Sequence, residues 1–519
     1  MPTSSLQRRG RHATRAGQEF GWVVGWTILG TFLPGSGLLA AGRRVAGWYV
    51  VVISLAALAA AGGYLASTGI SLRTLLTDAV DPQFLLTVAI LFGALAVFML
   101  VVILYTHMAL RREAVLTVGQ RVLSAALVLS LLAAVLAPLG TASRYALIQR
   151  DLLTKVFGGK HANKTAPRAK VGKANPWAGV PRLNVLLMGS DAGPDRTGLR
   201  PDSMILASIN TSTGDTVMFN LPRNLQRAPF PEGSQGAKAW PYGFGPVGSS
   251  GRRSCDATKT SDDGQLCELN AIWVTTEQSA RSYFPGDDDP GLTATEQAIQ
   301  GVTGLKVDYY VMLDLSGFKD FVNALGGIRV NIKERLPIGG SVSYPHATEW
   351  LEKGDNQLLD GYHALWFARS RWSTSDYSRM KRQRCAIAAL AKRADPVKLA
   401  QGFAQIAASL EKHLSTDIPL DQLSAWVELA LKVKKNKIRS LPITPEVYGG
   451  SWANPDFSLI LAAVQANLNP PKKAATTPST SAGTGSTATT TKSTRRHHTT
   501  STTTTPSDPN VAMDVNAVC

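Results

Sequence analysis

Apolar positions gather in long stretches over the first third of the chain. The four stretches lie near 20–42, 45–67, 84–106 and 122–140. A helix needs roughly 20 apolar residues to cross a bilayer, and the last three stretches meet that length. The first stretch is broken by Leu33-Pro-Gly-Ser-Gly37, which cannot continue a helix smoothly. We therefore predict a membrane region over residues 20–140, with three spans and one re-entrant segment.

Beyond a juxtamembrane linker at 141–179, the pattern becomes one of short strands alternating with helices over residues 180–468. Predicted strands cover 185–188, 204–210, 216–221, 309–313 and 328–332. Predicted helices cover 292–302, 317–325, 396–410 and 419–433. Gly214, in the polar link between the second and third strands, predicts a hairpin there. This alternation predicts an α/β domain, a mixed sheet covered by helices on both faces, preceded by an all-α membrane region.

Two other segments lack this periodicity. Residues 230–268 are rich in Gly, Pro and Trp and are too long for a simple connector, so they are either functional or disordered. Residues 469–519 form a Thr/Ser/Pro-rich tail that cannot bury a core and is predicted to be disordered. Its composition fits an O-glycosylated stalk or an unmodified spacer. The less polar end, Asp514 to Cys519, is predicted to dock back onto the domain.

Charge suggests how the chain is oriented. The formal net charge is +17, and residues 1–19 form a basic tail without the features of a removable signal peptide. Three spans would place this tail, Arg43 and Arg44, and Arg111, Arg112 and Arg121 on the cytoplasmic side, as the positive-inside rule requires. The basic stretch between Arg144 and Lys170 opposes this orientation. We expect a multi-pass cell-membrane protein with its domain outside the cytoplasm. No nucleic-acid-binding signature is present.

The four cysteines support the same placement. No Cys-x-x-Cys pair occurs, which argues against a structural zinc site and a thioredoxin-type motif. Cys255 and Cys267 flank a polar loop and are the first disulfide candidates, and Cys385 with Cys519 would form a second bridge. Disulfides belong to oxidising compartments. The alternative is that all four are free thiols.

Two aspartates lie at predicted strand ends. Asp191 follows a strand and a Gly-Ser turn, and Asp202 comes just before the next strand. Carboxylates on adjacent strand ends can share one Mg²⁺ ion, which takes carboxylate oxygens together with substrate phosphates. The alternative for either residue alone is turn or cap chemistry.

Arginines accompany these carboxylates. Arg200 and Arg223 each stand beside a proline at a strand end. Arg369 and Arg371 would point the same way on an extended strand, either toward an anion or as solvated groups of an edge strand. Arg379, Arg382 and Gln383 are spaced to share one helix face, with Asp376 as the expected N-cap. Guanidinium forks bind phosphate oxygens in pairs, so the set suits a pyrophosphate beside a divalent metal. Walker, Rossmann, nucleophile-elbow and His-Glu-x-x-His motifs are missing from the sequence.

At these residues the domain resembles the LytR-CpsA-Psr family, over about 180–465. The resemblance rests on ordered motifs: Gly189-Ser-Asp191, Arg200-Pro-Asp202, Leu221-Pro-Arg223, Asn270-Ala-Ile, Gly304-Leu-Lys-Val-Asp-Tyr-Tyr-Val, Asn323-Ala-Leu-Gly-Gly-Ile-Arg-Val, Leu359-Asp-Gly-Tyr-His-Ala-Leu, Arg369-Ser-Arg371 and Asp376-Tyr-Ser-Arg379-Met-Lys-Arg382-Gln383. The several membrane segments look like an actinobacterial variant. The resemblance implies an α/β/α sandwich with an apolar tunnel for a lipid.

The resemblance also implies an activity, that of a glycopolymer–peptidoglycan phosphotransferase. Such an enzyme moves a glycopolymer from a polyprenyl-pyrophosphate carrier onto peptidoglycan through a phosphodiester link, in cell-wall assembly. Carried over, Asp191 and Asp202 would bind Mg²⁺, or Mn²⁺ in its place. The pyrophosphate would be held by Arg200, Arg223, Arg369, Arg371, Arg379 and Gln383, and the catalytic arginines would be Arg223, Arg369 and Arg371. The alternatives are a pyrophosphate hydrolase acting on lipid-linked precursors and a noncatalytic lipid-carrier binding or regulatory protein.

Overall fold

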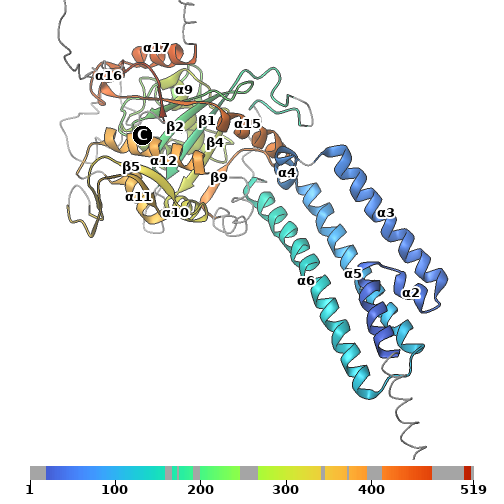
Figure 1. Cartoon of the computed structure of the whole chain (residues 1–519). Helices are drawn as coiled ribbons and strands as arrows, with labels where there is room; N and C mark the ends of the chain where they lie inside the picture. Colours follow the sequence, from blue (N-terminus) through green and yellow to red (C-terminus); the bar gives the residue numbers. More distant parts are fainter. Residues whose placement is uncertain are drawn as a thin grey trace, which may run out of the picture.

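The protein consists of a bundle of long helices that carries an α/β domain at one end (Figure 1). The computed structural model describes residues 19–69, 71–157, 166–171, 175–190, 199–245, 267–340, 345–370, 373–393, 412–469, 508–515 and 519.

Among the described residues, three helices are long and apolar enough to cross a membrane, the number predicted: α3 (Arg44–Thr68), α5 (Pro82–Arg112) and α6 (Val118–Phe157). The short helix α4 (Leu72–Ala79) lies between α3 and α5. Helix α5 begins at Pro82 because the Asp81 carboxylate accepts the N–H groups of Gln83 and Phe84, while proline has no N–H to lose at that position. That these helices cross a bilayer stays a prediction.

The first apolar stretch doubles back on itself. Residues 19–32 are helical, the chain bends at Leu33 to Gly35, and helix α2 (Ser36–Ala40) runs back. Gly35 has a φ of 98°, which favours glycine, so this residue permits the bend. Val23, near the start, and Leu38 and Ala41, near the end, pack in one cluster with Leu110 of α5. The stretch therefore has the shape of a hairpin whose two ends lie beside the turn between α5 and α6.

A seven-stranded mixed sheet forms the centre of the domain, in the order β11-β10-β3-β2-β1-β4-β9. Its strands are β1 (Arg182–Ser190), β2 (Pro201–Asn210), β3 (Thr216–Leu221), β4 (Tyr309–Asp314), β9 (Leu414–Thr416), β10 (Ile438–Pro442) and β11 (Met513–Asp514). The pairs β1–β4 and β3–β10 are parallel, and the other neighbours are antiparallel. The predicted hairpin is β2–β3. Two small sheets lie beside it, β5 (Ile328–Ile332) with β8 (Gly354–Leu359) and β6 (Leu336–Ile338) with β7 (Glu349–Leu351).

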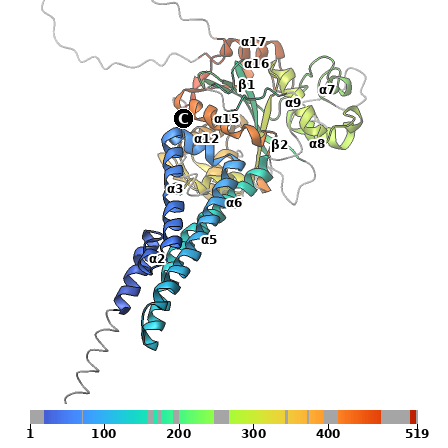
Figure 2. The same cartoon turned by 90° about the vertical axis from the view of Figure 1, so that its right-hand side faces the viewer.

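Helices cover both faces of this sheet, as predicted. They are α7 (Gln235–Ala239), α8 (Ile272–Thr275), α9 (Pro290–Thr303), α10 (Leu315–Ala324), α11 (Gly361–Arg369), α12 (Asp376–Arg393), α15 (Leu423–Lys435), α16 (Pro445–Tyr448) and α17 (Phe457–Leu468), with short helical turns η2 (Leu269–Ala271), η3 (Thr276–Ala280), η4 (Arg281–Tyr283) and η5 (Leu420–Gln422). Leu186 and Phe219 pack toward α8, α9 and α17, whereas Ile205 and Met218 pack toward α12. Figure 2 shows β1 and β2 between these two layers. The α/β/α sandwich is therefore confirmed.

Some local predictions were wrong or fall elsewhere. Arg369 does not lie on a strand; it ends helix α11, which starts where the Asp360 carboxylate accepts the N–H of His363. Asp376 is the first residue of α12 rather than its cap, because Ser375 Oγ accepts the N–H of Ser378. The predicted helix at 396–410 lies entirely outside the described residues.

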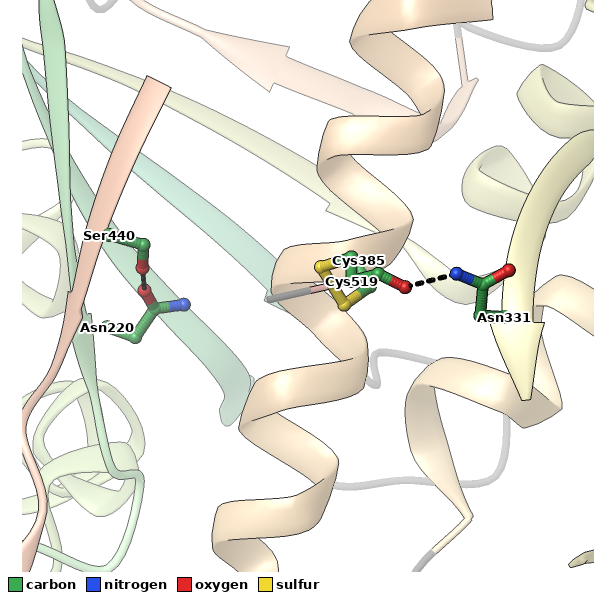
Figure 3. Close-up of a disulfide and its surroundings, with 5 residues drawn as sticks. All are labelled: Asn220, Asn331, Cys385, Ser440 and Cys519. Carbon is green, nitrogen blue, oxygen red and sulfur yellow. Dashed lines mark hydrogen bonds between the residues drawn. A yellow bond between two sulfur atoms is a disulfide. The ribbon is translucent and has the colours of Figure 1, made fainter. Parts of the chain in front are cut away.

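The end of the chain returns to the domain, as predicted for Asp514 to Cys519. Strand β11 pairs with β10 at the sheet edge, and a disulfide joins Cys519 to Cys385 of α12. Figure 3 shows the carbonyl oxygen of Cys519 accepting a hydrogen bond from the Asn331 amide, at 2.7 Å. The predicted disordered tail therefore includes a docked end. Cys267 is also disulfide-bonded, and Cys255 lies outside the described residues.

We expect the double variant Cys385→Ala/Cys519→Ala to lose about 2–4 kcal/mol of unfolding free energy, because the bridge closes a long loop in the unfolded chain. Its thermal unfolding midpoint, followed by circular dichroism, should lie below that of the oxidised wild type. Wild-type protein treated with reductant provides the comparison and should shift in the same direction. An unchanged midpoint in the double variant would show that the bridge does not stabilise the domain.

Candidate functional site

The candidate site lies where four central strands begin or end. Ser190 at the end of β1 is paired with Pro201 at the start of β2 and with Asp314 at the end of β4. Leu221, the last residue of β3, is paired with Met204 of β2. These four strand ends therefore lie together at one end of the sheet, and the ends of strands are where open α/β sheets bind ligands.

An ion pair joins two of the predicted residues at this edge. Arg223 follows β3, and its Nη1 lies 2.8 Å from Oδ1 of Asp202, the second residue of β2. The Arg223 side chain is only 19% exposed. Its backbone carbonyl accepts the N–H of Asn270 at 3.1 Å, which fixes the loop after β3 to η2. The guanidinium is therefore held in one place by its partner and by its backbone.

Helix α12 supplies two more of the predicted residues. Arg379 is 5% exposed, and its Nη2 lies 3.5 Å from the backbone oxygen of Asp202. Gln383 accepts a hydrogen bond from the Ser203 hydroxyl through Oε1, at 3.3 Å. Both side chains contact the start of β2, which agrees with the prediction that they share one face of the helix. At the beginning of the helix, the hydroxyls of Tyr377 and Tyr448 lie 2.8 Å apart and tie α12 to α16.

Arg382, predicted to share this face, takes a different role. Its Nε donates to the carbonyl of Phe367 at 2.8 Å, and its Nη2 donates to the carbonyl of Ser370 and to the Thr374 hydroxyl. Burial lowers the pKa of Arg382 to about 10, with Glu334 opposing the shift and Arg379 adding to it. The side chain therefore anchors the connection between α11 and α12, next to Arg369.

Of the remaining predicted residues, two are described by the structure and two are not. Arg369 is exposed at the end of α11, with its guanidinium 5.1 Å from the ring centre of Trp366. Arg200 is half-buried directly before β2. Asp191 and Arg371 lie outside the described residues, so the metal pair and the second arginine of the Arg-x-Arg motif stay predictions.

One cavity of about 720 Å³ joins all six of the predicted residues that are described. Its polar part is lined by Arg200, Asp202, Arg223, Arg369, Arg379 and Gln383. Its apolar part lies between the sheet and helices α10–α12 and is lined by Leu187, Ile205, Val311, Phe318, Phe321, Leu365, Ile387 and Leu390. The cavity therefore presents cationic groups in one part and hydrocarbon surface in the other.

Sequence reasoning missed three further residues of the cavity wall. Asn270 is 3% exposed, and its Oδ1 makes no hydrogen bond to any described residue. Glu268 lies beside it in the wall. Asp314 caps α10 through the N–H of Gly317 and lies 2.7 Å from Nδ1 of His413. Asn270 belonged to a quoted motif but carries no charge, and no sequence signal connects Asp314 with His413.

The donor atoms present suit a hard cation only in part. Within the described ranges, no group of three or more His, Cys, Asp or Glu residues could hold a metal. Asp202 remains as one carboxylate at the cavity wall, 35% exposed and facing Arg223. Mg²⁺ is commonly held by one or two carboxylates together with substrate phosphates and water, so this residue fits such an ion when the phosphate is present.

We expect Arg382→Lys to destabilise the domain by about 2–3 kcal/mol, because an ammonium group cannot span the acceptors that the guanidinium reaches. Chemical denaturation would measure the loss, and limited proteolysis should cut more readily near residues 367–374. Arg329→Lys, an exposed arginine on β5, is the matched control and should change little. If both variants were equally stable, Arg382 would not be the anchor of this connection.

Comparison with known proteins shows similar chains among cell-wall and regulatory proteins. Biofilm regulatory protein A of Streptococcus mutans is 26% identical over 279 residues, which cover 52% of this chain and 59% of that protein. Polyisoprenyl-teichoic acid–peptidoglycan teichoic acid transferase TagU of Bacillus cereus is 22% identical over 263 residues, covering 50% and 66%. This chain therefore matches less than two thirds of either relative.

Similar solved structures include TagV of B. subtilis, with 22% identity and a TM-score of 0.36, covering 55% of this chain and 96% of that one. A LytR-Csp2A-Psr enzyme from Actinomyces oris has 19% identity and a TM-score of 0.36, covering 58% and 93%. The sequence model of the LytR_cpsA_psr family matches residues 151–469, which is more than half of the chain. The chain therefore belongs to the LytR_cpsA_psr family.

Proposed function

We propose that this protein is a membrane phosphotransferase that moves a glycopolymer from a polyprenyl-pyrophosphate carrier onto peptidoglycan. The observation that carries the proposal is the single cavity with an arginine-lined polar part and an apolar part between the sheet and helices α10–α12. A lipid-linked pyrophosphate has the same two-part chemistry. Four described arginines line the cavity and outnumber its three described carboxylates, Asp202, Glu268 and Asp314, so an anionic ligand is favoured.

The relatives supply the classes of donor and acceptor. The name of TagU states a polyisoprenyl-linked teichoic acid as donor and peptidoglycan as acceptor. For this chain we propose the same classes, a lipid-linked glycan and peptidoglycan, without choosing a polymer. Fixed guanidinium groups at the cavity wall are suited to such a donor, since they bind phosphate oxygens in a paired geometry.

The proposed reaction is a displacement at phosphorus. A sugar hydroxyl of the acceptor attacks the sugar-linked phosphorus, the pyrophosphate P–O bond breaks, and polyprenyl phosphate leaves with the bond electrons. The hydroxyl proton passes to one of the site carboxylates. Arg223 and Arg369, with Arg371, stabilise the charge that develops on the phosphate oxygens. A Mg²⁺ or Mn²⁺ ion held by Asp202, with Asp191, would add neutralising charge when bound.

The helices support an extracytoplasmic domain. The turn between α5 and α6 and the ends of the first hairpin gather at the end of the bundle remote from the domain (Figure 1). Arg43 and Arg44 lie there, as do Arg111 and Arg112 in the last turn of α5. Under the positive-inside rule this end is cytoplasmic, so three spans would leave the α/β domain on the other side.

Transfer itself is tested with purified full-length protein in detergent, a polyprenyl-pyrophosphate oligosaccharide, Mg²⁺ and peptidoglycan fragments. Mass spectrometry should detect a phosphodiester-linked glycan on the fragment, and chelation of the metal should suppress it. Release of glycan phosphate that needs no acceptor would instead identify a hydrolase. Tight donor binding with no product, with or without metal, would identify a lipid-carrier binding protein.

We expect Arg369→Met to lower the transfer rate by roughly 10²–10³-fold, since one preorganised donor to a developing oxyanion contributes about 3–4 kcal/mol to the barrier. Arg335→Met is the matched control. Arg335 also stacks on a tryptophan, Trp350, but it lies outside the cavity and pairs with Glu352. The initial rate of product formation measures both variants. A rate in Arg369→Met equal to that of the control would exclude Arg369 from the reaction.

A further inference from the structure

A second hollow lies at the same edge of the sheet as the cavity. Its volume is about 310 Å³, at the lower end of the range for small-molecule sites. It forms between the segment that follows β3 and the segment before α17, which leave neighbouring parallel strands at their carboxyl ends. The backbone N–H of Gln226 donates to the carbonyl of Trp452 at 2.9 Å and holds the two segments together.

Aromatic rings and prolines make up the floor and walls of this hollow. Trp240 is 3% exposed and stacks on Phe230 with a centroid distance of 5.3 Å and an interplanar angle of 20°. Phe244 packs edge-on against Trp240 from below, at 5.1 Å. Tyr242 is 75% exposed, although it follows this packed base closely in sequence. An exposed phenol ring on a rigid support is a flat apolar surface that costs little conformational entropy to use.

The rim carries polar groups without partners in the described structure. Arg227 and Asn454 are both exposed, and neither side chain makes a hydrogen bond or ion pair with any described residue. Arg227 has a φ of 55°, which is uncommon for a residue other than glycine. The segment is also tightly held, because a Cβ on Gly243 would lie 2.6 Å from the Arg227 carbonyl oxygen. The rim therefore presents a guanidinium and an amide from fixed backbone.

We propose that this hollow is a glycan subsite that binds a pyranose unit of one of the two polymers joined in the reaction, an inference that rests on the proposed transfer function. The apolar face of a sugar ring fits on an exposed aromatic side chain, and its hydroxyls accept from guanidinium and amide donors. Among the described residues that line the hollow, Arg227 is the one charged side chain, which disfavours a multiply charged lipid headgroup as the ligand.

The position suits a substrate that extends out of the cavity. Arg227 follows Arg223 by four residues, so the two backbones are at most about 14 Å apart. A glycan chain bound in the hollow would therefore have its next units near the arginine-lined wall. Either the acceptor strand or the glycan portion of the donor meets this description, since both are chains of pyranose rings.

Direct binding tests the chemistry without any need for catalysis. Full-length protein in detergent is titrated by calorimetry with a β-1,4-linked N-acetylglucosamine tetrasaccharide and, separately, with the glycan released from the donor. We expect binding of at least one, weakened tenfold or more by Tyr242→Ala and retained by Tyr242→Phe, which keeps the ring. Tyr283→Ala changes a tyrosine exposed outside the hollow and should bind as the wild type does.

Transfer kinetics then identify which polymer the hollow serves. A rise in KM for peptidoglycan fragments in Tyr242→Ala assigns the hollow to the acceptor, and a rise in KM for the donor assigns it to the donor. If the wild type binds neither glycan but still catalyses transfer, the proposed glycan subsite is wrong and the proposed transfer function is retained. If glycan binding depends on Tyr242 but the protein transfers no glycan, the proposed transfer function is wrong and the glycan subsite is supported. Binding of a proline-rich peptide in place of both glycans would overturn the assignment.

Discussion

The ion pair between Asp202 and Arg223 joins two strand ends that are 21 residues apart in sequence, and the cavity wall is arranged around it. Asp202 belongs to the strand, and its carboxylate and backbone oxygen each face an arginine, Arg223 and Arg379. One acidic residue thus positions two cations that would otherwise repel each other. The arginine that follows β3 and the arginine on α12 are far apart in sequence, so this contact also couples the hairpin to the helix layer.

Much of this arrangement was predictable because local chemistry decided it. Gly214 and the polar link around it required a hairpin, and the spacing of Arg379 and Gln383 placed both on one helix face. The buried strand ending at Gly189 was equally clear from its apolar run. In each case the signal lies within a few residues, and the tertiary structure did not override it.

The failures arose where a helix cap or a distant part of the backbone decided the outcome. Arg369 and Arg371 are separated as on a strand, but the Asp360 cap begins a helix that continues through Arg369. Arg382 has the correct helical spacing, yet its side chain donates hydrogen bonds to backbone carbonyls of the segment before α12. Helical spacing alone does not predict where that segment lies. Asp314 and His413 are 99 residues apart and meet only because β4 and β9 pair. Asn270 was overlooked because the sequence alone does not show that a neutral amide is buried at a site.

The docked end of the chain changes what the Thr/Ser-rich segment is. Helix α17 ends at Leu468, β11 begins at Met513, and the disulfide fastens Cys519 to α12. The Thr/Ser-rich segment between α17 and β11 is therefore joined to the domain at both of its ends. A single proteolytic cut within it would leave both fragments covalently joined until the bridge was reduced.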